Sequence, residues 1–246
     1  APARKAGWQW RTPPQHRTGN GYVFSSAHIS EDEAAATLLA NLDGAPQGDP
    51  RLLKFRAGKR RKAWNRNVVA IGLASGFLEP LGSTSIHLIQ SGITRLLDFL
   101  PGGPVAGADV AAYNRLTDFE IERIRDFVVL HNFANGRDDP FWDAQRRMAL
   151  PESLSFRLDM FNSSGRIIRE ADELFDVPGW IQVMTGQGLV PDRWHPLADD
   201  LTGDQLDQFL STVSQAFARD AARMPGHADY LARFCAPSSP SQSSIA

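Results

Sequence analysis

The sequence predicts a protein of the α+β class, with short strands in roughly the first third of the chain and helices in the remainder. Before residue 80, runs of β-branched and aromatic residues alternate with Gly, Asn, Asp and Pro, which is typical of strands joined by turns. Beyond it, apolar residues recur every three or four positions, the spacing of amphipathic helices. A chain of 246 residues is long enough to bury a sizeable core.

The expected strands lie in three segments. Residues 22–29 follow the turn pair Asn20-Gly21 and are rich in β-formers. Residues 51–58 and 67–75 flank a basic turn, and we expect a strand in each. Within the last segment, Val68 to Ile71 form a continuous apolar run, the pattern of a strand buried on both faces.

The first expected helix is short and begins after Ser30, which with Glu33 forms a capping-box pattern, and it extends to Leu42. A stronger helical pattern starts at Thr84. Its apolar positions are Ile86, Ile89, Ile93, Leu96, Leu97 and Leu100. Further helices are predicted at 109–135, 143–148, 151–163 and 202–223, and the Ser/Pro-rich residues 237–246 are expected to be a disordered tail.

Composition excludes several functions. The net charge of -2 gives no overall field for nucleic acid, and the basic turn at 58–62 is interpreted as solvated. Cys235 is the only cysteine, and the six histidines lack metal-ligand spacing, so no metal site is expected. Because no apolar run reaches about 18 residues, we expect a cytoplasmic protein without a membrane partner.

The segment 68–89 is the strongest candidate for a ligand site. Gly72, Gly76 and Gly82 allow close backbone approach, and free amides at the start of the following helix favour an anion. An ordinary glycine-containing turn with a Ser/Thr cap is the alternative. His87, near the helix start, is interpreted as a core hydrogen-bonding residue, with a catalytic role as the alternative.

Two aromatic pairs are further candidates. Trp8 and Trp10 are two residues apart, so in an extended segment both rings lie on one face, either as an aromatic wall or as a core anchor. Phe141 and Trp142 follow a turn, where they could stack on a planar substrate or pack a corner between helices.

Together, the segments "GWQWRTP", "QHRTGNGYVFSSAHISEDEA", "NVVAIGLASGFLEPLGSTSIHLIQ" and "ERIRDFVVLHNFANGRDDPFW" resemble the flavin-dependent tryptophan halogenases from about Gly7 to Cys235. No GxGxxG dinucleotide fingerprint occurs, and the sequence begins with Ala1 rather than Met. We therefore expect the C-terminal half of such an enzyme. Residues 1–82 would belong to a flavin-monooxygenase-type FAD and halide domain, and 83–236 to a mainly helical substrate region.

The resemblance implies a reaction and its cofactors. Reduced FAD, supplied by a separate flavin reductase, forms a flavin hydroperoxide that yields hypohalous acid from chloride or bromide, and an electron-rich aromatic such as tryptophan or another indole is halogenated. The implied FAD contacts are Gly72, Gly76, Pro80, Leu81 and Ser83. The implied halide contacts are the amides of Thr84 and Ser85.

The resemblance also implies how the substrate is held. Phe141, Trp142, His131 and Asn132 match substrate-binding positions. Trp8, Trp10 and Pro13 match a barrier that keeps the substrate away from the flavin. Gly82, beside Ser83, stands where the family has a catalytic glutamate, so no catalytic residue is assigned and this fragment is expected to be inactive.

Two other functions stay open at this point. One is a degenerate paralogue that binds an aromatic ligand without chemistry, and the other is a flavin monooxygenase that hydroxylates its substrate. A homodimer is one option for the assembly.

Overall fold

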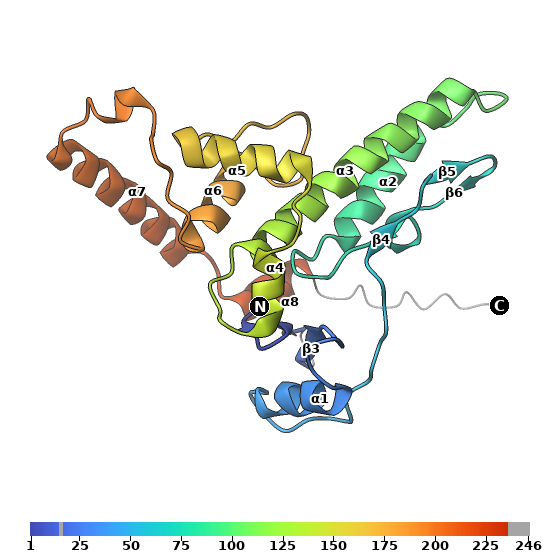
Figure 1. The fold of residues 1–246 in the computed structure, drawn as a ribbon, viewed down its shortest axis with the longest axis horizontal. Coiled ribbons are helices and arrows are strands. Elements are labelled where there is room, and N and C mark those ends of the chain that lie inside the picture. Colours follow the sequence, from blue (N-terminus) through green and yellow to red (C-terminus); the bar gives the residue numbers. More distant parts are fainter. Residues whose placement is uncertain (15–16, 236–246) are drawn as a thin grey trace. The chain divides into compact units, whose positions relative to one another are not determined.

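The computed structural model describes residues 1–14 and 17–235 and divides into two compact units, 1–194 and 195–246 (Figure 1). The first unit contains every described strand and the helices that carry the candidate site. The predicted tail at 237–246 lies outside the described residues. The α+β class is confirmed, because short strands precede long helices.

A three-stranded antiparallel sheet opens the first unit, with order β1-β2-β3. Its strands are β1 (Ala3–Arg4), β2 (Gly7–Thr12) and β3 (Gly19–Phe24). The chain leaves β3 five residues before the predicted end of the strand at Ile29 and forms α1 (Glu31–Ala40). As expected, Ser30 caps this helix, its side chain accepting from the Glu33 amide at 3.1 Å.

The prediction of two strands at 51–58 and 67–75 is largely wrong. The structure has only two-residue pairs: β4 (Gly58–Lys59) with β7 (Gly76–Phe77), and β5 (Trp64–Asn65) with β6 (Val68–Val69). A one-turn helix, η1 (Gly72–Ala74), interrupts the second segment. Val68 is 62% exposed, so it is not part of a strand buried on both faces.

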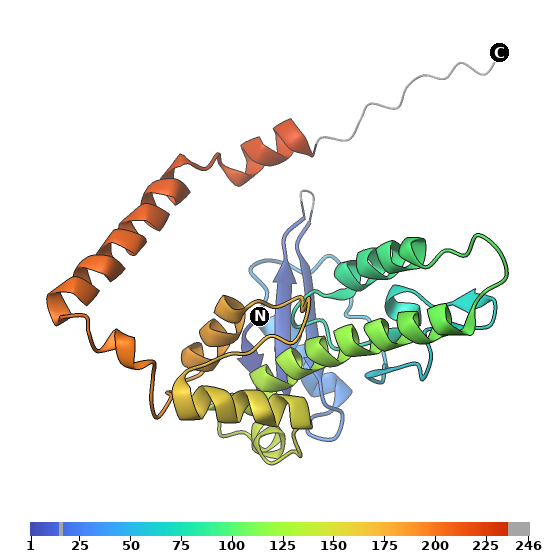
Figure 2. The same ribbon diagram turned by 90° about the horizontal axis from the view of Figure 1, so that it is seen from above.

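Helices α2 (Ser85–Asp98) and α3 (Gly107–Phe133) lie side by side and confirm the two strongest helix predictions (Figure 2). They are joined by polar contacts. Arg95 of α2 donates to Glu120 and Thr117 of α3 at 2.9 and 3.0 Å, and the imidazole of His87 lies 2.8 Å from Glu120. His87 is thus a hydrogen-bonding residue between two helices.

Three shorter helices surround the C-terminal part of α3: α4 (Pro140–Arg146), α5 (Glu152–Ser164) and α6 (Val177–Gly186). Their main core contains Phe127, Leu130, Leu154, Leu158, Phe161, Trp180 and Met184. Inside it, Arg157 donates to Glu173 at 2.7 and 3.0 Å and lies over the Trp180 ring. Sequence analysis missed α6, a 10-residue apolar helix that begins after the Asp176 cap.

The second unit contains η2 (Pro196–Ala198), α7 (Gly203–Arg223) and α8 (His227–Phe234). The prediction of α7 is confirmed, since Thr202 and Gln205 form a capping box at its start. Leu206, Phe209 and Phe217 form an exposed apolar row along this helix.

Candidate functional site

The site begins with strand β2, which presents two indoles on one face. Trp8 and Trp10 are two residues apart on a strand and therefore lie on the same face. Together with Glu79, they line a small cavity of about 10 Å³. Trp10 is paired with Gly21 on β3, where a Cβ atom would lie 2.2 Å from the indole. Glycine at position 21 is therefore required for the Trp10 ring to cross the neighbouring strand.

Trp8 is connected by hydrogen bonds to two distant parts of the chain. Its indole Nε1–H donates to Asn132 Oδ1 at 2.7 Å, and Asn132 Nδ2 donates to Glu79 Oε1 at 2.8 Å. Asn132 is buried near the end of α3, and Glu79 follows β7. Strand β2, helix α3 and the segment before α2 thus meet through three side chains.

Burial controls the ionisation of two groups here. It raises the pKa of Glu79, while the hydrogen bond from Asn132 opposes this shift. It lowers the pKa of His131, while the hydrogen bond that the ring donates to the Phe127 carbonyl at 2.7 Å acts in the opposite sense. Both groups are therefore biased toward their neutral forms.

The start of α2 presents unpaired backbone donors. Ser83 has a left-handed φ of 53°, Thr84 is buried, and no side chain caps the helix. The amides of Ser85, Ile86 and His87 have no hydrogen-bond acceptor among the described residues. With the helix dipole, this geometry suits an anion.

The three glycines of segment 68–89 differ in what a Cβ atom would contact at each position. At Gly72, with φ of 59°, a Cβ would lie 2.4 Å from Ile89 of α2, and at Gly76 it would lie 3.2 Å from the Gly58 carbonyl oxygen. Both glycines serve close packing inside the chain. At Gly82, a Cβ would make only ordinary contacts, 3.4 Å from Phe175 and 3.5 Å from Thr84, so a larger side chain fits there.

Of the predicted substrate residues, Trp142 and Asn132 contact Trp8 on strand β2. Trp142 is fully buried, donates to the Arg4 carbonyl at 2.7 Å, and contacts Trp8 edge-on. Phe141 is partly buried against His28, with 5.3 Å between ring centres. His131 and Asn132 are adjacent on α3. Pro13, the third predicted barrier residue, is exposed just beyond β2.

Sequence reasoning missed the residues that complete this surrounding structure. Phe175 stacks on Phe127 with 3.7 Å between ring centres and faces the space beside Gly82. No periodic pattern identified Phe175, which lies in a loop. Asn132 was predicted, but its bonding partners, 53 and 124 residues away, have no local signal.

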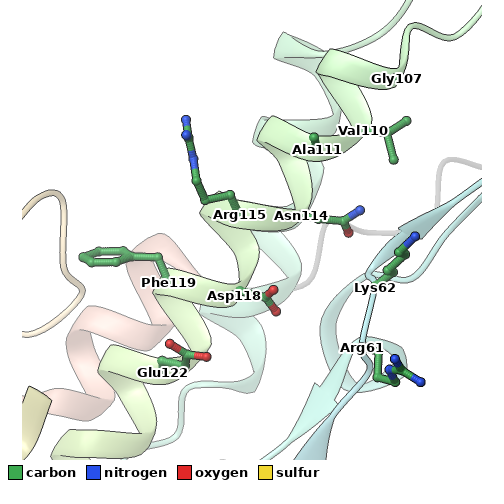
Figure 3. Close-up of a pocket in the computed structure, with 10 residues that line it drawn as sticks. All are labelled: Arg61, Lys62, Gly107, Val110, Ala111, Asn114, Arg115, Asp118, Phe119 and Glu122. Carbon is green, nitrogen blue, oxygen red and sulfur yellow. The ribbon is translucent and has the colours of Figure 1, made fainter. Parts of the chain in front are cut away.

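A second cavity, of about 650 Å³, lies elsewhere in the first unit and is lined by none of the predicted site residues. Figure 3 shows Arg61 and Lys62 on a segment at one side of α3, with Arg115 and Phe119 projecting from the opposite side of the helix. Lys59 pairs with Asp118 and Glu122 nearby. Among the residues that the structure describes, no His, Cys, Asp or Glu cluster could hold a metal, and none of the helices could span a bilayer.

Halogenases are among the known proteins with similar sequences and structures. The profile of the tryptophan halogenase family matches residues 1–203. The chain is 31% identical over 211 residues to tryptophan 7-halogenase RebH of Lentzea aerocolonigenes, a match covering 79% of this chain and 40% of that protein.

Two solved structures are similar over nearly the whole chain. A flavin-dependent halogenase from Xanthomonas campestris is 48% identical with a TM-score of 0.91, covering 97% of this chain and 48% of that one. A second, from Brevundimonas sp. BAL3, is 44% identical with a TM-score of 0.89, covering 94% and 47%. The chain thus spans about half the length of these relatives.

Proposed function

Because the chain belongs to the tryptophan halogenase family, we propose that it forms the C-terminal part of a flavin-dependent halogenase that chlorinates or brominates an indole-like aromatic. The observation that carries this proposal is the meeting of three family segments through Trp8, Asn132 and Glu79. These segments are far apart in the sequence, and their convergence favours an intact site over isolated motifs.

The start of α2 fits a halide and one edge of a flavin. The free amides of Ser85, Ile86 and His87 suit chloride or bromide, and Ser83 and Thr84 directly precede them. Gly72, Gly76, Pro80 and Leu81 would contribute one wall of the FAD site. When bound, reduced FAD would react with O₂ and so supply the two-electron oxidant for the halide, and a separate flavin reductase would provide the reduced FAD.

In this proposal, the chain's own residues separate and orient the reactants. The indoles of Trp8 and Trp10 form a barrier between flavin and substrate. Phe141, Trp142, His131 and Asn132 shape the substrate side. Trp142 acts by supporting Trp8, because its own ring is fully buried. Gly82 contributes no charge, so the rate should be low for the family.

We also propose that residues 1–82 complete the FAD and halide domain and that 83–236 form the substrate region. The apolar side chains Ile86, Ile93 and Leu97 on α2, and Leu100 just beyond its end, are exposed and would be covered by the remainder of the complete polypeptide. The 246-residue chain alone should therefore not turn over.

The test is to assay the complete polypeptide with FAD, a flavin reductase, NADH and bromide, using indole and tryptophan as substrates. A product with the paired isotope masses of bromine, formed only when bromide is present, would support a halogenase. A product with one added oxygen would instead indicate a monooxygenase. Binding of indole without any product would indicate the non-catalytic alternative.

A further inference from the structure

Asn132 lies between the indole of Trp8 and the carboxyl group of Glu79. The indole N–H can only donate a hydrogen bond, and the carboxyl group, when ionised, can only accept one. The indole N–H of Trp8 has no acceptor capacity, and a carboxylate has no proton to donate. The amide of Asn132 offers one oxygen to Trp8 at 2.7 Å and one NH₂ group to Glu79 at 2.8 Å. With Glu79 ionised, only this orientation of the amide satisfies both neighbours.

Few charged groups face Glu79. The small cavity beside it is lined by uncharged side chains, namely Trp8, Trp10, Val23, Pro80 and Leu81, and by Ala1, whose amino terminus is the one ionisable group in that lining. From α3, Asn132 contacts the carboxylate, while the neighbouring His131 donates to the Phe127 carbonyl instead. The bond from Asn132 is therefore the main polar contact of Glu79 among the described residues.

We propose that Glu79 and Asn132 are positioning residues for Trp8, so that the indole is held in place while Glu79 is ionised and is released when Glu79 takes up a proton. Calling Trp8 a barrier residue rests on the proposed function. The coupling between the three side chains rests on their geometry alone.

The physical reason is the direction of the hydrogen bonds. A bond to a charged carboxylate is roughly twice as strong as one between neutral groups. Once protonated, Glu79 accepts more weakly from Asn132 through its carbonyl oxygen and can also donate to Asn132 Oδ1, so the amide is no longer fixed in one orientation and can turn over. The NH₂ group would then face the indole N–H of Trp8, two donors that cannot bond, and the link to the barrier strand would be lost.

The buried position makes this switch accessible. Burial raises the pKa of Glu79 above its ordinary value of 4.5, so proton uptake begins closer to neutral pH than it would for an exposed glutamate. Without burial, the carboxylate would stay ionised over most of the range in which a protein is stable.

The experiment follows the indole N–H resonance of Trp8 in the ¹⁵N-labelled chain from pH 4 to pH 8, assigned with Trp8→Phe. In the wild type, we expect one titration with a midpoint above 4.5. On its acidic side, hydrogen exchange at Trp8 should be about two- to tenfold faster relative to Trp64. Trp64 is a suitable reference because its indole donates to the Arg66 carbonyl, away from any carboxylate.

Glu79→Gln is the matched control, because the amide keeps an acceptor for Asn132 and cannot ionise. This variant should show the hydrogen-bonded Trp8 resonance with no titration. A pH-dependent change caused by any group other than Glu79 would persist in Glu79→Gln and is thereby separated. Asn132→Leu should remove both the bonded shift and the titration, and the first two proteins decide the question if that variant does not fold.

A Trp8 resonance that does not change with pH in the wild type would overturn the proposal, as would an equal titration in Glu79→Gln. The measurement contains no flavin, halide or substrate. Failure of the halogenation assay would leave its result unchanged, and a flat titration would leave the proposed reaction unaffected.

Discussion

The indole of Trp142 lies edge-on against the indole of Trp8, with 5.0 Å between ring centres and an angle of 78° between the planes. Trp142 lies on α4 and Trp8 lies on β2, and the two residues are 134 positions apart in the sequence. Trp142 also donates to the Arg4 carbonyl on β1. One buried side chain therefore joins a helix of the proposed substrate region to the sheet β1-β2-β3.

Replacing Trp142 should destabilise the chain strongly. Trp142→Ala removes a fully buried ring and should lower the free energy of unfolding by about 3 to 5 kcal/mol. Trp142→Phe keeps most of the volume but leaves the Arg4 carbonyl without its donor, so we expect a loss of about 1 to 3 kcal/mol. Urea denaturation measures both. Phe156→Ala on α5, where the ring is 51% exposed, should cost less than about 1 kcal/mol.

Gly82→Glu should accelerate the complete polypeptide if the missing acid limits its rate. The Cβ position makes only ordinary contacts with Phe175 and Thr84, so the side chain can be accommodated. A charge that stabilises a transition state contributes on the order of 10² to 10³ in rate, and we expect a gain of that size in product formation. Gly82→Gln has the same size without the charge. Equal gains from both variants would show that the acid is not the cause.

The exposed apolar face of α2 should contribute to stability and to FAD retention only in the complete polypeptide. Leu97 is 65% exposed, so Leu97→Glu should change the unfolding free energy of the 246-residue chain by less than about 0.5 kcal/mol. In the complete polypeptide, it should weaken FAD retention and lower the melting temperature. Leu88→Glu, at a buried position of the same helix, should destabilise both proteins. A harmless Leu97→Glu in the complete polypeptide would contradict the proposed packing.

The helices could be predicted because their signals are local. Ser30 with Glu33 and the apolar positions after Thr84 carry information within a few residues, and α1 and α2 begin where these patterns predict. The strands failed for the opposite reason. A β-forming run such as 67–75 does not specify a partner, and here only two residues pair.

The candidate site could be predicted as a set of residues but not as a network. Alternation placed Trp8 and Trp10 on one face, and helix periodicity placed Asn132 near the end of α3. Neither pattern could show that Asn132 bonds to Trp8, because the two are 124 positions apart and the contact depends on how β2 packs on α3. The same holds for Phe175, which a loop brings to Gly82.

His131 should make the chain less stable in mild acid. Because burial holds the pKa of His131 below its ordinary value of 6.5, the unfolded chain binds the proton more readily between the two values. The contribution of His131 to the free energy of unfolding is thus fully present above pH 6.5 and becomes smaller as the pH falls below that value. His131→Asn cannot take up the proton and keeps an N–H near the Phe127 carbonyl.

The contribution of Glu79 to stability changes with pH in the opposite direction to that of His131, so the two effects must be measured separately. Because its folded-state pKa is raised, its contribution to stability is present at low pH and falls as the pH rises above 4.5. We therefore compare Glu79→Gln with the double variant Glu79→Gln/His131→Asn by urea denaturation between pH 7 and pH 5. The single variant should lose stability toward pH 5, and the double variant should lose less. Parallel curves would show that His131 does not titrate in this window, and the acid sensitivity would then belong to another group.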